Sequence, residues 1–248
     1  MIKSPLKWAG GKTALLPKIQ KIWKNYEDHC WVDLFGGSCV LPLNLQPTQA
    51  IVNDSNSHLI NFWKWVQTEG FSKIQFNTSE KSYYRLRELF NCKPQPELFY
   101  YLNKVGFRGL CRYNSKGEFN VPFGYYKNPN VQLMFLKQKQ IVKNWQFVNE
   151  DFQKIQIPIN GLVFADPPYF ETFTNYTKEN FTWSNQVLIA EKLAQLDNPV
   201  IACNSWNDQI VNLYSTLGFK VEKITMPRSI SIDGDRQPVF ELFATKNI

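Results

Sequence analysis

The sequence is poor in the residues that build metal sites and disulfide frameworks. Its 248 residues include two histidines, which stand apart, and five cysteines, of which no two form a C-x-x-C pair. Both observations argue against a zinc site, and we expect no metal. Isolated cysteines are typical of proteins kept in reducing conditions, so we expect reduced, buried thiols in a cytoplasmic protein.

Long apolar segments are also missing. No run of about 18 apolar residues suggests a membrane span, and the N-terminus lacks the apolar stretch of a signal peptide. Acidic residues are in deficit, because 28 Lys and Arg stand against 21 Asp and Glu and the formal charge is +7. This balance favours a polyanionic partner. The hydrophobic content of 44% supplies a packed core of one α/β domain with an insertion, or of two small domains.

Two nucleotide-binding fingerprints are absent. The sequence has no G-x-G-x-x-G, which argues against NAD and FAD. Gly11-Lys12-Thr13 is similar to the end of a phosphate loop, but that motif requires a glycine five positions before Gly11, where this chain has Leu6. No apolar strand of useful length precedes it. These two facts exclude a nucleoside triphosphatase.

The most informative motif present is Asp166-Pro167-Pro168-Tyr169. It follows the apolar run Leu162–Ala165, which predicts a buried strand. Ligands of open α/β sheets bind at the carboxyl ends of strands. A carboxylate and a fixed carbonyl can accept both N–H bonds of an exocyclic amine and localise its lone pair, while an aromatic ring holds the flat base. The motif therefore indicates methyl transfer to an amino group, although alone it also fits a structural turn.

A second strand-and-turn motif indicates a nucleoside-containing cofactor. The apolar run from Val32 leads into Gly36-Gly37-Ser38, where glycines allow close approach of a ligand and Ser38 can cap the next helix. Asp54 ends the next short strand, 21 residues after Asp33. An acid at that distance is placed to bind ribose hydroxyls. Each half of this pattern also occurs in purely structural turns.

Strand and helix patterns alternate along most of the chain, which predicts an α/β fold with a mostly parallel sheet. The last two strands are expected to form an antiparallel hairpin. A helical stretch interrupts the alternation, so we expect a catalytic domain of residues 1–55 and 145–248 and an inserted domain of residues 56–144. Expected strands are 31–35, 50–52, 145–148, 162–165, 200–203, 219–224 and 239–244. Expected helices are 15–23, 59–66, 79–90, 98–105, 132–143, 184–196 and 206–217.

These motifs together resemble the Dam-type DNA adenine-N6 methyltransferases. The resemblance rests on motifs in one order along nearly the whole chain: Pro5–Lys12, Asp33–Gly37, Asn53-Asp54, Gly109–Asn114, Gly117–Gly124, Asp166–Tyr169 and Arg228–Ser231. It implies a Rossmann-like methyltransferase sheet, S-adenosylmethionine as cofactor, duplex DNA as partner and a target-recognition insertion. It also implies a monomer acting in a bacterial cytoplasm, encoded by the bacterium or by a phage, with or without a paired restriction enzyme.

The resemblance assigns roles to individual residues. Asp166, Pro167 and Tyr169 are the implied catalytic group. The implied cofactor-binding residues are Trp8, Lys12, Phe35, Gly36, Asp54 and Asp166. Within these, Asp54 would bind the ribose, Trp8 would pack beside the methionine part and Lys12 would lie near its carboxylate. Apart from the resemblance, core packing is the favoured interpretation for Trp8, and a solvated helix start is the favoured interpretation for Lys12.

The implied DNA-binding residues are concentrated in the insertion: Lys7, Phe107, Arg108, Leu110, Arg112, Asn120, Pro122, Tyr126 and Arg228. Arg112 is the expected base reader, because arginine grips guanine O6 and N7 with two parallel bonds. Phe107 stands where the family has a wedging tyrosine, and Arg108 stands where it has asparagine. The implied target is GATC. A basic surface is expected from Lys104, Arg108, Lys116, Lys127, Arg228 and Arg236, with salt-sensitive binding.

The implied reaction flips an adenine out of the duplex and methylates N6. Two alternatives stay open at this point. The acceptor can be another amine, such as cytosine N4 or an amino group in RNA or protein, because related motifs occur across that wider class. The chain can also be a sequence-specific DNA-binding protein that has lost catalysis, although intact Asp54 and Asp166 argue against this.

Overall fold

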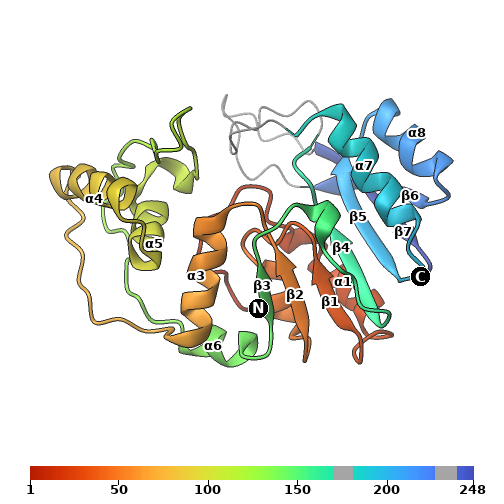
Figure 1. Ribbon diagram of the computed structural model, residues 1–248, viewed down its shortest axis with the longest axis horizontal. Coiled ribbons are helices and arrows are strands. Elements are labelled where there is room, and N and C mark those ends of the chain that lie inside the picture. Colours follow the sequence, from red (N-terminus) through yellow and green to blue (C-terminus); the bar gives the residue numbers. More distant parts are fainter. Residues whose placement is uncertain (170–180, 227–238) are drawn as a thin grey trace.

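The computed structural model describes residues 1–169, 181–226 and 239–248. A seven-stranded sheet organises the fold, in the order β3-β2-β1-β4-β5-β7-β6 (Figure 1). The strands are β1 (Cys30–Asp33), β2 (Ala50–Asn53), β3 (Gln146–Val148), β4 (Gly161–Ala165), β5 (Val200–Ser205), β6 (Lys220–Met226) and β7 (Val239–Lys246). Neighbours among β1 to β5 run parallel, and β7 is antiparallel to β5 and β6. The predicted mostly parallel α/β fold with a C-terminal antiparallel hairpin is confirmed.

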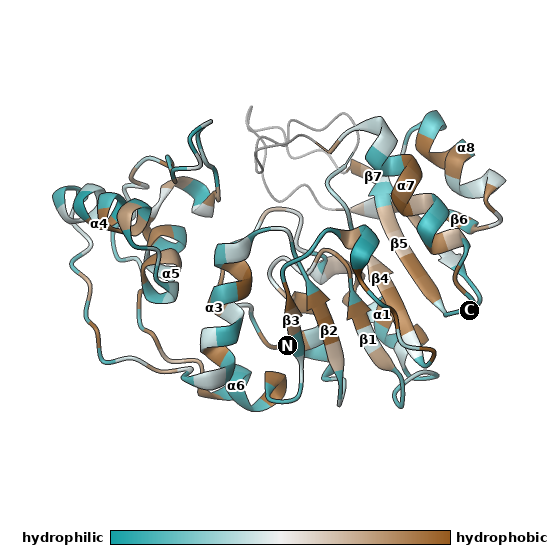
Figure 2. Cartoon of the chain, viewed as in Figure 1, coloured by the Kyte–Doolittle hydropathy of each residue, from teal (hydrophilic) through white to brown (hydrophobic). Residues whose placement is uncertain are grey.

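Apolar residues on both faces of the sheet explain why it lies between helices. Along β4, Leu162 and Phe164 belong to one buried cluster, whereas Val163 and Ala165 belong to the other. Strands buried on both faces read as continuous apolar runs, as they do in the centre of this sheet (Figure 2). The side-chain period of two sends alternate residues to opposite faces.

Helices cover the two faces separately. Residues of α1 (Leu16–Trp23), α2 (Val40–Leu45) and α3 (Ser57–Thr68) pack into the first cluster. Residues of α7 (Trp183–Ala194) and α8 (Asp208–Thr216) pack into the second. Short 3-10 helices lie at Thr13–Leu15, Phe107–Gly109 and Phe152–Lys154. Within the described ranges, no helix is both long and apolar enough to cross a membrane.

The stretch between β2 and β3 projects from one end of the sheet. It begins with α3, continues through α4 (Glu80–Cys92) and α5 (Pro96–Val105), and returns through α6 (Leu136–Val142). Figure 1 shows α4 and α5 beyond α3, away from the strands. Because α3 also packs on the sheet, through Trp63 stacked at 6.0 Å on Phe147 of β3, the division at residues 56 and 144 stays a prediction.

Three local expectations were wrong. The helix expected from Gln132 begins at Leu136, because Met134 forms a β-bridge with Phe71 instead. The helix expected to start at Ser184 is capped by Thr182, whose hydroxyl accepts from the Asn185 backbone in a capping box. Ser38 does not cap α2; that position belongs to Cys39, which has a left-handed φ of 53°.

The sheet topology brings three acids to one edge. β1 lies between β2 and β4 in parallel register, and Asp33 ends β1 while Asp54 and Asp166 follow β2 and β4 directly. The carboxyl ends of adjacent parallel strands share one edge, which is where ligands of such sheets bind.

Candidate active site

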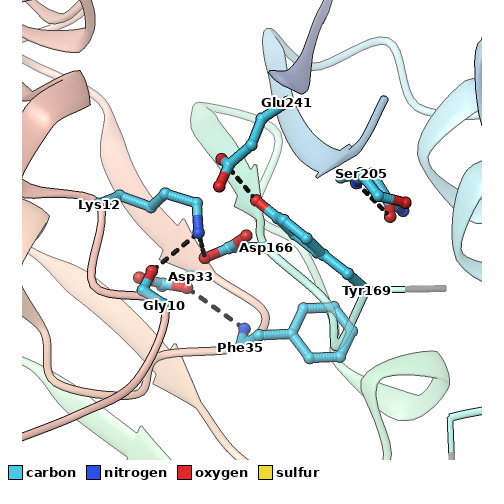
Figure 3. A network of polar contacts seen from close by, with 9 residues as sticks. Gly10, Lys12, Asp33, Phe35, Asp166, Tyr169, Ser205 and Glu241 are labelled. Atoms are coloured by element: carbon cyan, nitrogen blue, oxygen red, sulfur yellow. Dashed lines mark hydrogen bonds and ion pairs between the residues drawn. The ribbon is translucent and has the colours of Figure 1, made fainter. Parts of the chain in front are cut away.

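The Asp166 carboxylate lies in an ion pair at this edge. Its Oδ2 is 2.7 Å from Lys12 Nζ, which also donates to the carbonyl of Gly10 at 2.8 Å (Figure 3). The same ammonium is 4.9 Å from the centroid of the Tyr169 ring. The Lys12 ammonium therefore lies beside both Asp166 and Tyr169, the two residues that the sequence predicts to bind the amino group of the substrate.

The other oxygen of this carboxylate is enclosed by the protein. Asp166 Oδ1 is buried and accepts no hydrogen bond within the described residues. Burial raises the pKa of Asp166, and the Lys12 ammonium offsets part of that rise. Burial alone would lower the pKa of Lys12, but the neighbouring acids, with Asp166 first and Glu241 among them, outweigh it and the pKa is raised. A buried acceptor without a donor is costly unless a ligand supplies one.

Buried polar side chains hold the turn after Asp166 in place. Gln186 on α7 donates its amide to the Pro168 carbonyl at 2.8 Å, and Asn204 on β5 donates to Gln186 Oε1 at 2.8 Å. Gln186 and Asn204 are fully buried. Sequence reasoning missed both; a polar residue on the apolar face of a helix and another inside an apolar strand were the available signals.

Tyr169 is anchored by a residue of the C-terminal hairpin. Its hydroxyl donates to Oε2 of Glu241 on β7 at 2.8 Å (Figure 3). Burial raises the pKa of Glu241. This contact fixes the ring that stands beside Asp166, and it joins residues 72 positions apart in the chain. Glu241 was absent from the sequence-based site because no local motif marks it.

The glycine turn after β1 packs closely against its surroundings. A Cβ on Gly36 would lie 2.3 Å from a methyl carbon of Val52, and one on Gly37 would lie 2.8 Å from Trp8 Nε1. Gly37 also has a left-handed φ of 48°. Side chains are therefore excluded at both positions, and Trp8 lies directly on the turn.

Asp54 is bound to the same turn. Its Oδ2 accepts from the Gly37 backbone at 3.0 Å and its Oδ1 accepts from the Asn56 backbone at 2.9 Å. Burial raises the pKa of Asp54, and the two backbone N–H groups oppose the rise. A carboxylate has about four lone-pair positions, so each oxygen can accept a further bond. These acceptor positions fit the hydroxyls of a ribose diol beside the glycine turn.

Asp33 differs from its two neighbours because it is enclosed. It is 3% exposed, and its Oδ1 accepts from the Phe35 backbone at 3.2 Å. Burial raises its pKa to about 8, with a contribution from the charge of Asp166. Asp33 is therefore mostly protonated at neutral pH. The centroid of the Phe35 ring lies 5.6 Å from that of Phe152 and 5.8 Å from that of Phe181, and the three rings form an apolar wall beside the acids.

The candidate DNA-reading residues lie in the projecting part of the chain. Phe107 is 41% exposed, and its backbone N–H donates to the Pro122 carbonyl at 2.8 Å. Arg108 has a left-handed φ of 55°, and its guanidinium carbon is 5.1 Å from the Phe107 ring centroid. Leu110 is half-buried, whereas Pro122 is exposed. The exposed ring of Phe107 and the exposed Pro122 thus come from two segments that are joined by backbone hydrogen bonds.

Arg112 and Asn120 form a pair across a short hairpin. Tyr113 and Phe119 form a β-bridge, and the Asn120 backbone donates to the Arg112 carbonyl at 3.1 Å. Arg112 Nε donates to Asn120 Oδ1 at 2.9 Å. Its Nη2 is 3.5 Å from the Asn120 carbonyl, at the limit of a hydrogen bond. Among the described residues, Asn120 therefore binds Nε and, at the longer distance, Nη2, which leaves Nη1 and the second N–H of Nη2 for another acceptor.

Lys7 is firmly bound to the projecting part. Its Nζ donates to the Lys104 carbonyl at 2.9 Å and lies 3.6 Å from the Tyr126 ring centroid. Its backbone N–H and carbonyl bind the side chain of Asn103, which is fully buried, at 2.8 and 2.7 Å. Burial lowers the pKa of Lys7. Sequence reasoning missed Asn103, which holds the N-terminal segment in place.

The remaining basic candidates divide into three groups. Lys116 and Lys127 are exposed, as a solvent-facing basic surface requires. Lys104 is half-buried, and its Nζ donates to the Pro5 carbonyl at 3.1 Å. Arg228 and Arg236 lie outside the described residues. The structure thus brings the cofactor and catalytic candidates together at the sheet edge and the base-reading candidates together on the insertion.

Comparison with known proteins identifies the family. Residues 8–230 match the family model of D12 class N6 adenine-specific DNA methyltransferases. The chain is 34% identical to the DNA adenine methylase of Escherichia coli K12 over 265 residues, which cover 96% of this chain and 93% of that protein. It is 32% identical to the Retron Ec67 DNA adenine methylase of Escherichia coli, over 96% of this chain and 90% of the relative.

A third relative comes from an archaeon. The type II methyltransferase M.MjaIII of Methanocaldococcus jannaschii is 31% identical over 284 residues, covering 97% of this chain and 98% of that protein. The match therefore extends over the sheet, the glycine turn, the insertion and the turn after β4 together. The chain belongs to the D12 class of N6 adenine-specific DNA methyltransferases.

Proposed function

We propose that this protein uses S-adenosylmethionine to methylate N6 of a flipped adenine in duplex DNA, at GATC. DNA adenine methylation and an S-adenosylmethionine donor follow from the family; the target sequence, the flipping and the residue roles are the proposal. The proposal rests on the buried Asp166 Oδ1, which accepts no hydrogen bond from the part of the chain that the structure describes and belongs to a carboxylate whose other oxygen binds a nitrogen. An exocyclic amine would donate the hydrogen bond that this oxygen is able to accept.

The residues at the sheet edge suit the cofactor. Asp54 would bind the ribose hydroxyls with the lone pairs that Gly37 and Asn56 leave free. Gly36 and Gly37 allow close approach, with Trp8 packed on the turn beside the methionine part. Phe35 offers an apolar face to a flat ring. When bound, S-adenosylmethionine supplies a methyl group made electrophilic by its sulfonium charge.

The catalytic turn would prepare the amine for attack. Asp166 and the Pro167 carbonyl accept its two N–H bonds, so the lone pair is no longer held in the ring and points toward the methyl group. Tyr169, fixed by Glu241, stacks on the base. Lys12 would stay on the other oxygen, Asp166 Oδ2, and lie near the cofactor carboxylate. Positioning of this kind can supply roughly 7–11 kcal/mol of a barrier.

Flipping is required because the amine is paired inside the duplex. Extrusion costs a few kcal/mol, which stacking on Tyr169 and a wedge in the vacated gap partly offset. The exposed Phe107, tied to Pro122 by its backbone, suits that wedge. Arg108 beside it brings a positive charge to the phosphates.

Recognition of GATC would depend on the hairpin pair. Arg112, oriented by Asn120, would offer the remaining N–H groups of its terminal nitrogens to guanine O6 and N7, a contact worth about 1–3 kcal/mol of discrimination. Leu110, Pro122 and Tyr126 would supply apolar base contacts. Lys7 would serve as a phosphate or base contact, although its present bonds to the insertion must loosen for this. In this scheme residues 1–55 and 145–248 catalyse the reaction as a monomer, and residues 56–144 recognise DNA.

The test is direct. The protein is incubated with labelled S-adenosylmethionine and duplex DNA, and sequencing of the methylated product gives the modified base and its site together. We expect N6-methyladenine within GATC. Asp166→Ala should abolish methylation and spare DNA binding, while the exposed acid Asp197→Ala should change neither. Turnover by Asp166→Ala, or methylation of cytosine N4, would refute the assignment.

A further inference from the structure

Three polar side chains on α4 form hydrogen bonds with the backbone of the hairpin that carries Arg112 and Asn120. Tyr83, Arg87 and Asn91 are spaced four residues apart, so they share one face of the helix. The Tyr83 hydroxyl donates to the Val121 carbonyl at 2.9 Å, and Arg87 Nη1 donates to the same oxygen at 3.1 Å. Asn91 Nδ2 donates to the Phe119 carbonyl at 3.2 Å, and Asn91 Oδ1 accepts from the Phe119 N–H at 2.8 Å.

These bonds fall on the two residues that flank Asn120. Phe119 and Val121 are buried, at 1% and 0% exposed. Side chains alternate along an extended strand, so Asn120 projects from the opposite side, where its Oδ1 accepts from Arg112. Asn91 binds both backbone groups of Phe119, as a neighbouring strand would. The other edge of this segment is closed by the bond from the Asn120 N–H to the Arg112 carbonyl.

The stem of the hairpin must set the orientation of the pair. Residues 115–118 at its tip are exposed, and Gly117 has a left-handed φ of 79°. The tip has no buried side chain to hold it. Arginine distinguishes guanine only when its planar guanidinium is aligned with both O6 and N7. A small rotation of Asn120 would therefore move the Arg112 guanidinium out of alignment with the base.

We infer that α4 is the positioning element for base reading, and that Asn91, supported by Tyr83 and Arg87, sets the Arg112 guanidinium through Asn120. These are positioning residues, which act through the hairpin. The inference rests on the proposed function, in which Arg112 reads guanine. It assigns a specificity role to a helix that faces the backbone of the hairpin.

The test measures discrimination between sites. Asn91→Leu keeps the side-chain size and removes both hydrogen-bonding groups. We compare kcat/KM on duplexes that carry the site found by sequencing with kcat/KM on duplexes changed at its guanine. We expect the ratio to fall by about tenfold, within the range of one bidentate arginine contact. Arg85→Gln and Glu88→Gln, at exposed positions of the same helix, should leave the ratio unchanged.

A double-mutant cycle separates positioning from general stability. In an Arg112→Ala background, Asn91→Leu should have no further effect on the ratio, because the reader is already gone. An Asn91→Leu variant that loses kcat/KM equally on all duplexes, or that lowers the ratio again without Arg112, would overturn the inference.

A second variant keeps the inference testable if Asn91→Leu melts below the assay temperature. Tyr83→Phe combined with Arg87→Met releases the Val121 carbonyl and retains most of the packing, and it must show the same loss of discrimination. A lack of methylation by the unmodified chain would instead count against the proposed function. Methylation with discrimination that survives both variants would overturn the role of α4 alone.

Discussion

Replacing Asp33 by asparagine should stabilise the protein at neutral pH and flatten the dependence of its stability on pH. Asp33 is 3% exposed at the end of β1, and its carboxyl accepts from the Phe35 N–H. The asparagine carbonyl can accept the same bond. The substitution therefore removes an ionisable group with little change in shape.

The magnitude follows from the raised pKa. Burial moves the pKa of Asp33 from 3.8 to about 8. Between these values the folded state keeps its proton and the unfolded state has lost it, so the unfolded state binds fewer protons. The free energy of unfolding therefore falls by about 1.4 kcal/mol per pH unit as pH rises through this window. From pH 5 to pH 7 this group alone removes about 3 kcal/mol, which asparagine would restore.

Urea unfolding followed by tryptophan fluorescence at pH 5, 6 and 7 measures this effect, since the chain has eight tryptophans. The stability advantage of Asp33→Asn over the unmodified protein should widen by about 1.4 kcal/mol per pH unit. Asp197→Asn, at an exposed site, serves as the control and should track the unmodified protein. Parallel pH profiles for Asp33→Asn and the unmodified chain would refute the assignment of a buried, protonated Asp33.

Two further predictions concern the catalytic turn. Lys12→Met removes the charge that lowers the pKa of Asp166. The acid limb of the pH profile of kcat/KM should therefore move to higher pH. If the limb does not move, Asp166 is not the group whose titration produces it. Gln186→Leu removes the bond to the Pro168 carbonyl and leaves Asn204 without its acceptor. We expect this variant to lose about tenfold or more in kcat with little change in KM for DNA, because misplacement of about 1 Å near the reacting atoms has such effects. An increase in KM alone would contradict a role in positioning the turn.

The sheet and its site edge were accessible from sequence because their signals are local. An apolar run followed by Asp166, and another followed by Gly36, mark strands and the loops after them, and parallel pairing brings such loops to one edge. The helices of the insertion were also found from their apolar periodicity. Local patterning therefore predicts where the acids gather, although the roles of individual residues are not tested by it.

The contacts that hold the site were not accessible, because they join residues far apart in the chain. Glu241 meets Tyr169 only through the antiparallel pairing of β7, and Asn91 meets Phe119 only through the packing of α4 on the hairpin. The start of α7 was predicted wrongly for a different reason. Thr182 and Ser184 are both acceptable caps, and the choice depends on the reciprocal bond with Asn185.

The stretch from Lys7 to Lys12 connects the insertion to the sheet edge. Its first residue is tied to Asn103 on the insertion, and its last is tied to Asp166 at the sheet edge. The five Cα–Cα steps from Lys7 to Lys12 span at most about 18 Å when fully extended. This link would limit any displacement of the insertion from the sheet edge, and a wider separation would require one of its two ends to detach. Adding residues to the stretch would therefore loosen the coupling between the position of the insertion and that of Asp166.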